Sequence, residues 1–159
     1  MRWIWIDKFI EFESGRRAVA VKNVSLAEEH LHDHFPGYPV MPASLIVEGM
    51  AQTAGILVGE AGGFKEKVIL AKVKRASFRR EVRPGEQLRH EAAIEHLAPE
   101  AATTIGRVWV NGELLAEIDI VFSHIDNNLS GLTFPKENFV FTDEFLSLLR
   151  TYNVSTKKA

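Results

Sequence analysis

Two side chains in the first third of the chain, His34 and Glu48, have the types and surroundings needed for proton transfer. His34 opens the run His-Phe-Pro-Gly, in which the proline and Gly37 favour a tight, fixed loop. Glu48 lies in an apolar segment whose nearest polar side chains are Ser44 and Gln52, so we expect a poorly hydrated carboxyl group. An imidazole and a carboxylic acid held apart on rigid elements suit a general base and a general acid in an elimination, with Gly37 and Gln52 as supporting residues.

Residues 42 to about 60 must position the acid, and they are the one long helical segment that the sequence predicts. Apolar residues occupy nearly every side of this helix, which is typical of a helix buried in the core. The Ser44 hydroxyl has the chemistry of an N-cap, because it can accept a hydrogen bond from a first-turn N–H. Gly62 and Gly63 are expected to end the helix.

Stretches rich in β-branched and aromatic residues lie on both sides of this helix in the sequence. A short helix is predicted to begin at Ser25, which forms a capping box with Glu28, and to end before Pro36. Asn111-Gly112 is a strong hairpin signal. The predicted strands are 3–12, 18–24, 68–82, 87–97, 103–110 and 113–124. One buried helix followed by an antiparallel meander predicts the α+β class, with a curved antiparallel sheet wrapped around one long central helix.

Residues 126–159 depart from this pattern and are predicted to form a C-terminal helical extension of a single domain at 1–125. Thr142 is expected to cap an amphipathic helix that is too short to be stable alone. We expect its apolar face to dock on the outer face of the sheet or at an assembly interface. That face is predicted to consist of Phe145, Leu148, Leu149 and Tyr152. The connecting segment is expected to be held by Phe134, Phe139 and Phe141.

The composition of the 159 residues is that of an ordinary globular domain, with 46% hydrophobic and 25% charged residues. A net charge of -2 gives no reason to expect a nucleic-acid partner. The absence of cysteine excludes disulfides, thiolate nucleophiles and cysteine-ligated zinc. The N-terminal apolar run is too short for a signal peptide, and no stretch has the apolar length that spans a bilayer. We therefore expect a cytoplasmic protein with no membrane partner.

Several motifs, dispersed but in order, are similar to those of a known family. They are His34-Phe-Pro-Gly, Pro42, Glu48, Met50-Ala51-Gln52, Phe78-Arg79-Arg80, Val82, Pro84-Gly85-Glu86-Gln87-Leu88, and Gly112-Glu113-Leu114 to Phe122. Together they resemble the (3R)-hydroxyacyl-acyl-carrier-protein dehydratases of the hotdog fold, over residues 3–124. The chain departs from the family at Ala43 and Asp33, where glycine is usual, and in residues 126–159, which have no usual counterpart.

The resemblance implies reversible loss of water from a (3R)-hydroxyacyl thioester, giving the trans-2-enoyl thioester, in fatty-acid or related acyl-chain synthesis. His34 would be the base and Glu48 the acid, one from each protomer of a dimer. The Ala43 N–H would stabilise the thioester carbonyl as negative charge develops on it. The implied partners are an acyl-carrier-protein or CoA thioester and a second copy of the chain, with a trimer of dimers as a further family expectation. No metal or other cofactor is implied. Isomerising relatives typically carry Asp at the Glu48 position, so simple dehydration is favoured.

Two further groups of residues are assigned to the substrate and its carrier. The acyl chain is expected in an apolar tunnel between the central helix and the sheet. Its predicted wall residues are Tyr38, Met41, Met50 and Phe78. A basic run between positions 72 and 83 is interpreted in two ways, as a solvated strand or as a docking surface for an acidic carrier protein. Its members are Lys72, Lys74, Arg75, Arg79, Arg80 and Arg83.

Three alternatives stay open. A hotdog thioesterase would use a carboxylate to activate water and would release free acid, although the His-Phe-Pro-Gly loop argues against it. A non-catalytic hotdog protein that binds acyl thioesters, or only oligomerises, is consistent with Ala43 and the C-terminal extension. A metal cluster at His30, His32, Asp33 and His34 resembles the ligand run of metallo-β-lactamase-like hydrolases, but it is one residue short.

Overall fold

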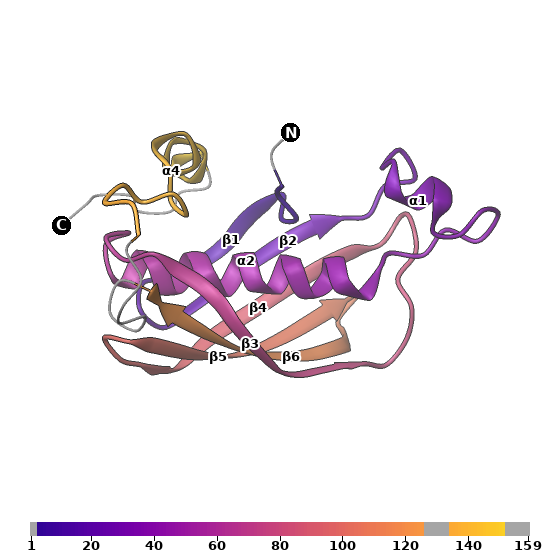
Figure 1. The fold of residues 1–159 in the computed structure, drawn as a ribbon. Helices are drawn as coiled ribbons and strands as arrows, with labels where there is room; N and C mark the ends of the chain where they lie inside the picture. The colour runs from indigo at the N-terminus through magenta and orange to yellow at the C-terminus, as the bar shows by residue number, and fades with distance from the viewer. Residues whose placement is uncertain (1–2, 126–133, 152–159) are drawn as a thin grey trace.

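The chain folds into a six-stranded antiparallel sheet that wraps around one long helix, α2 (Figure 1). The structure is a computed structural model and describes residues 3–125 and 134–151. In chain order the elements are β1 (Lys8–Glu13), β2 (Arg17–Asn23), α1 (His30–Asp33), α2 (Ala43–Ala61), β3 (Val68–Phe78), β4 (Gln87–Leu97), β5 (Ala101–Val110), β6 (Glu113–His124) and α4 (Asp143–Arg150). The strand order is β1-β2-β4-β5-β6-β3, and each neighbouring pair is antiparallel. The α+β prediction is therefore confirmed.

The helix α2 forms the centre of the core. Met50, Ala54 and Leu57 have no exposed surface. The sheet approaches the helix closely at Gly106 of β5, where an added Cβ would lie 2.6 Å from the Met50 sulfur and would overlap the Ile118 carbonyl oxygen. A side chain at position 106 would therefore force helix and sheet apart. Within the described part of the chain, no helix is long and apolar enough to cross a membrane.

The start of α2 differs from the prediction. The helix begins at Ala43 with Pro42 in the N-cap position, so Ser44 lies inside the first turn and the predicted Ser44 cap is wrong. Pro42, with φ fixed near −57° and an extended ψ of 130°, already turns the chain into the helix before Ser44 is reached. No side chain caps this end, which leaves first-turn N–H groups available to a ligand.

The short helix α1 also begins later than predicted, at His30 instead of Ser25. The capping pair itself is present, because the Glu28 carboxylate accepts the Ser25 N–H at 2.9 Å. However, Lys22 also binds Glu28 in a 2.6 Å ion pair, and residues 26–29 form turns and bends. The predicted Ser25–Glu28 contact is therefore present. However, Lys22 on β2 binds the Glu28 carboxylate, and these residues do not form a helical turn.

Three predicted strand ends shift by two residues or more. β1 begins at Lys8 because the Trp5 N–H donates to the Gln52 side chain at 2.8 Å and not to a strand. β3 ends at Phe78, where its register with β6 ends. β5 begins at Ala101 rather than at 103, because its pairing with β6 already starts there. The alternating patterns placed the strands correctly, and only their ends depend on these longer-range contacts.

The C-terminal helix α4 is capped as predicted, with the Thr142 hydroxyl accepting the Phe145 N–H at 3.3 Å. Leu149 has no exposed surface, and Phe145 and Leu148 are half-buried. The helix lies beside the C-terminal part of α2 (Figure 1), so the predicted docking on the outer face of the sheet is wrong. The reason is a cluster of aromatic rings at that end of α2, which accepts Phe141.

The connecting segment is held by fewer residues than predicted. Phe141 is buried and Phe134 is half-buried, whereas Phe139 is 51% exposed and does not hold the segment. Tyr152 lies outside the described residues. Residues 126–133 lie outside them as well, so the predicted boundary between 1–125 and 126–159 stays a prediction.

One fully buried titratable side chain, His90, makes the stability of the fold depend on pH. His90 on β4 has no exposed surface, and an added Cβ at Gly49 of α2 would lie 2.8 Å from its Nε2. Burial lowers the pKa of His90 to about 4, from an ordinary value near 6.5. Between these two values the unfolded chain binds a proton that the folded chain does not bind. Stability is therefore fully present above about pH 6.5 and is lost as the pH falls toward 4.

We predict that His90→Leu removes much of this acid sensitivity. The histidine's own contribution to the pH dependence of the free energy of unfolding is on the order of 3 kcal/mol over this range. Urea unfolding between about pH 7 and 5 should therefore show a smaller loss of stability in the variant than in the parent. His96→Leu, at an exposed position on the same strand, is the matched control. Equal pH slopes for the parent and His90→Leu would contradict the prediction.

Candidate active site

The His34 loop is fixed by its own hydrogen bonds. The Phe35 N–H donates to the Tyr38 carbonyl at 3.1 Å, and the Tyr38 N–H returns a bond of 2.9 Å to the Phe35 carbonyl. Gly37 has a φ of +73°, the left-handed region that favours glycine, so its predicted supporting role fits the turn. The half-buried His34 ring stacks on Phe35 with ring centroids 4.2 Å apart, and its Nδ1 lies 2.7 Å from the Val40 carbonyl oxygen.

This last contact fixes the imidazole tautomer. A carbonyl oxygen only accepts hydrogen bonds, so the Nδ1 atom of His34 carries the hydrogen that points to Val40. In the neutral ring the lone pair is then on Nε2. The loop therefore holds an imidazole with one nitrogen anchored and the other ready to take a proton.

Glu48 is half-buried on the second turn of α2 and is held by Gln52. The Gln52 Nε2 donates to the Glu48 carboxylate at 2.9 Å and to the Trp3 carbonyl at 3.0 Å. The Gln52 Oε1 accepts the Trp5 N–H at 2.8 Å, which fixes the orientation of the amide. Gln52 therefore binds backbone groups and at the same time orients the Glu48 carboxylate.

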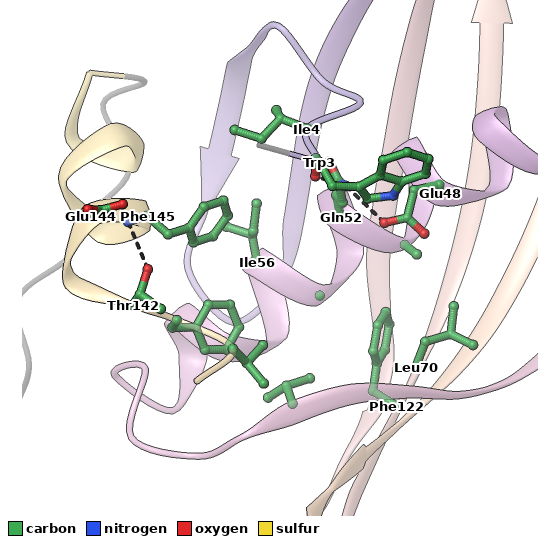
Figure 2. A pocket seen from close by; sticks show the side chains of 15 residues that line it. Trp3, Ile4, Glu48, Gln52, Ile56, Leu70, Phe122, Thr142, Glu144 and Phe145 are labelled. Atoms are coloured by element: carbon green, nitrogen blue, oxygen red, sulfur yellow. Dashed lines mark hydrogen bonds between the residues drawn. The ribbon is translucent and has the colours of Figure 1, made fainter. Parts of the chain in front are cut away.

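Glu48 lies at the wall of a cavity of about 410 Å³ between α2, the inner face of β3 and β6, and the C-terminal segment (Figure 2). Most of its lining is apolar. The lining residues are Trp3, Ile4, Glu48, Ala51, Gln52, Gly55, Ile56, Val68, Leu70, Phe122, Val140, Phe141, Thr142, Glu144 and Phe145. His34 is not among them, so within one chain this cavity is lined by Glu48 but not by His34. An apolar cavity with one carboxyl group at its wall suits a chain-like apolar ligand with a reactive end.

The predicted tunnel residues lie elsewhere. Met41 and Met50 are buried in the core, and Phe78 is half-buried at the end of β3. Tyr38 is exposed, donates to Glu81 at 3.0 Å and carries a guanidinium group over its ring. None of the four lines the cavity beside Glu48, and their role as tunnel walls stays a prediction.

The lining of the cavity beside Glu48 combines residues that the sequence marks for other reasons. Phe122 faces inward because it shares the alternation of Ile118 and Ile120 on β6, and that signal was available. Phe145 was recognised only as part of an apolar helix face. Trp3 was assigned to a strand. No local sequence pattern indicates that these segments, which lie far apart in the sequence, line one cavity.

Only some side chains of the predicted basic run lack a partner among the described residues. Arg75 pairs with Glu117 at 3.3 Å and Asp119 at 3.0 Å, so its charge is already matched on the outer face of the sheet. Arg80 pairs with Glu86 at 2.9 Å, and Arg83 lies 4.0 Å from the Tyr38 ring centroid. The other three members are exposed and form no ion pair with any described residue. They are Lys72, Lys74 and Arg79.

The neighbouring histidines have structural partners. His30 packs edge-on against Trp5 with centroids 5.2 Å apart, and burial lowers the pKa of His30. The His32 Nε2 lies 3.2 Å from the Leu26 carbonyl oxygen. Among the described residues, no group of three or more His, Cys, Asp or Glu side chains could hold a metal ion.

Ala43 occupies the place predicted for it. It is exposed at the first position of α2, and its N–H has no hydrogen-bond acceptor within 3–125 and 134–151. Free N–H groups at a helix start, with the positive end of the helix dipole behind them, favour negative charge on a bound oxygen.

Comparisons with known proteins agree with this architecture. The model of the FabA-like domain matches residues 3–119. The chain is 41% identical over 122 residues to the 3-hydroxyacyl-[acyl-carrier-protein] dehydratase FabZ of Pelotomaculum thermopropionicum, covering 76% of this chain and 87% of that protein. It is 40% identical over 125 residues to the dehydratase FabZ of Thermomicrobium roseum, covering 78% and 84%.

A solved structure supports the fold. The dehydratase heterocomplex ApeI:P of Xenorhabdus doucetiae matches with a TM-score of 0.64 at 14% identity, covering 76% of this chain and 82% of that one. At that identity the likeness concerns the fold alone, and with the family match it confirms the predicted hotdog fold. On the strength of the family model and of relatives at 40% and 41% identity, the chain belongs to the FabA-like family and, within it, to the 3-hydroxyacyl-[acyl-carrier-protein] dehydratases.

Proposed function

We propose that the protein catalyses reversible dehydration of (3R)-hydroxyacyl thioesters to trans-2-enoyl thioesters, as an enzyme of fatty-acid or related acyl-chain synthesis. The observation that carries the proposal is the half-buried Glu48 carboxyl group, oriented by Gln52 at the wall of an apolar cavity, in a chain related to FabZ dehydratases. The names of those relatives favour an acyl-carrier-protein thioester over a CoA thioester as the substrate. The predicted cytoplasmic location stays a prediction.

The reaction divides between the two titratable residues. The Nε2 of His34 takes the proton from the carbon next to the thioester carbonyl, and the double bond forms toward the neighbouring carbon. The hydroxyl group on that carbon leaves as water with a proton from Glu48, given by its acid form or through a held water. The reverse sequence hydrates the double bond. No step requires a metal or redox cofactor.

Removing the proton from the weakly acidic C–H places negative charge on the carbonyl oxygen, and this charge must be stabilised. The Ala43 N–H, free at the start of α2, is the donor we assign to that oxygen. The family usually has glycine at this position. Alanine keeps the N–H and differs from glycine by one methyl group, at a position that is exposed here.

We further propose that the site is completed by a second copy of the chain. The support is that His34 does not line the cavity of its own Glu48, and that β3 is an edge strand exposed along most of its length. Its inner face leaves Leu70 and Val73 42% and 37% exposed. A long edge with uncovered apolar side chains is suited to pairing with another strand. A trimer of dimers is an expectation from the family alone.

Mixing two inactive variants tests the shared site. Subunit exchange between His34→Ala and Glu48→Gln proteins should produce hybrid dimers in which one of the two sites has both groups intact. Because half of the randomly mixed dimers are hybrids, recovery should approach roughly a quarter of the parent activity. Native mass spectrometry verifies the exchange. Verified hybrids without any recovered activity would contradict a site made from two protomers.

The experiment that tests the function itself is a spectrophotometric assay of enoyl-thioester hydration, with acyl-carrier-protein and CoA thioesters compared side by side. A dehydratase consumes the conjugated double bond and leaves the thioester intact. Release of free thiol would instead identify a thioesterase. Binding without turnover of either kind would identify a non-catalytic acyl-thioester-binding protein. The free Lys72, Lys74 and Arg79 predict a salt-sensitive preference for the acyl-carrier-protein form.

A further inference from the structure

The C-terminal segment contributes a large part of the cavity that holds Glu48. It supplies Val140, Phe141, Thr142, Glu144 and Phe145 to the lining. These residues lie far from Glu48 in sequence and belong to the part of the chain that the FabA-like match, which ends at residue 119, does not cover. The cavity is therefore built by the family domain on one side and by an additional segment on the other.

Asn138 binds the segment to the domain through hydrogen bonds at both ends of its amide. The Asn138 Nδ2 donates to the carbonyl oxygens of Phe64 at 3.1 Å and Glu66 at 3.2 Å, just beyond the end of α2. Its Oδ1 accepts the N–H groups of Val140 at 3.0 Å and Phe141 at 2.9 Å. Both ends of the amide are occupied, so the chain that follows has a fixed path into the cavity wall.

Phe141 is then locked against α2. It is 5% exposed and meets Phe64 edge-on with centroids 5.0 Å apart. Its ring occupies the space over Gly59, where an added Cβ would lie 2.6 Å from Cε2 of the ring. The absence of a side chain at Gly59 therefore lets Phe141 approach the helix, and the wall that it forms is packed as tightly as the core.

Phe145 lines the end of the cavity that lies opposite Glu48. Figure 2 shows its ring pointing from α4 toward Ile56, with Glu48 and Trp3 at the other end. Ile56 lies eight positions after Glu48 on α2, which is about 12 Å along the helix axis. A chain whose reacting carbons lie at Glu48 would meet the Phe145 ring after roughly that distance.

We infer that the C-terminal segment sets the length of acyl chain that the enzyme accepts, with Phe145 as the residue that stops the chain and Phe141 as its support. The inference rests on the proposed dehydration and adds a determinant of its substrate class. Acyl chains that fit between Glu48 and Phe145 are preferred, and longer chains clash with a wall that the Asn138 and Phe141 contacts hold in place.

The test compares hydration rates of short, medium and long enoyl thioesters, from butenoyl through decenoyl to hexadecenoyl, in single variants of the full chain. Phe145→Ala should raise the ratio of long-chain to short-chain kcat/KM by at least about tenfold, and Phe145→Trp should lower it. Leu148→Ala, at a half-buried position on the same helix that does not line the cavity, is the matched control and should leave the ratio unchanged.

The two Phe145 variants are expected to shift the ratio in opposite directions. General damage to the helix would not do this, so opposite shifts identify Phe145 as the residue that limits acyl-chain length. If the parent is active but both Phe145 variants keep its ratio, or if Leu148→Ala shifts the ratio as much as Phe145→Ala, the inference is overturned and the dehydratase stands. If the parent hydrates no enoyl thioester of any length, the proposed function fails first, and the inference fails with it.

Discussion

His34→Ala is expected to lower kcat for enoyl-thioester hydration by about 10²–10⁴-fold while leaving the fold unchanged. The variant removes the nitrogen that we propose as the acceptor of the proton from carbon, and no other described residue offers one in the same loop. The loop should survive, because its closing bonds run between the backbone groups of Phe35 and Tyr38. Steady-state kinetics measure the loss, and circular dichroism with a melting curve establishes that the fold is intact.

A neighbouring histidine provides the control for this prediction. His32→Ala removes an exposed ring two positions away whose bond is to the Leu26 carbonyl, so activity should stay near that of the parent. A folded His34→Ala protein with near-normal turnover would show that the base is another group. Equal losses in both variants would point to disruption of α1 and not to the chemistry of His34.

Glu48→Gln should cause a loss of similar size, about 10²–10⁴-fold in kcat. The substitution preserves the shape of the side chain and an oxygen that can still accept from Gln52, but it removes the carboxyl group that we propose as the proton donor to the departing hydroxyl. Because the change is nearly isosteric, KM should move much less than kcat. The same assay and melting curve measure both quantities.

Glu60→Gln is the matched control, since Glu60 lies near the other end of the same helix and does not line the cavity. Its turnover should equal that of the parent. If Glu48→Gln retained full activity, the proton would have to come from elsewhere, and the assignment of Glu48 as the acid would be wrong.

The parts of the fold that could be predicted from sequence are those set by local pattern. The all-round apolar character of α2 required burial, and the alternation along β6 predicted a half-buried strand. The Ser44 cap failed because Pro42 began the helix earlier, and the Ser25 helix start failed because Lys22, from another element, binds Glu28. In both cases the local sequence pattern is present, but another residue, Pro42 or Lys22, determines where the helix begins.

The candidate site divides in the same way. His34 and Glu48 are predicted from their residue types and neighbours, which restrict the chemistry, and their roles stay predictions. A cavity between the central helix and the sheet is predicted from the sequence, but its C-terminal wall is not, because that wall depends on where Asn138 binds the carbonyl groups of Phe64 and Glu66, more than seventy positions back in the chain. Contacts of that sequence separation leave no periodic signal.

Trp3 has a practical consequence beyond its place in the cavity wall. Its indole is 62% exposed, lies edge-on to Trp5 at 5.1 Å and lines the same space as Glu48. Indole emission responds to the polarity around the ring, and an acyl chain that displaces water from this cavity changes that polarity. The only other tryptophan, Trp109, lies on β5 and does not line the cavity. Entry of the proposed acyl substrate into this cavity should therefore be detectable by intrinsic fluorescence, without a label and before any bond is broken.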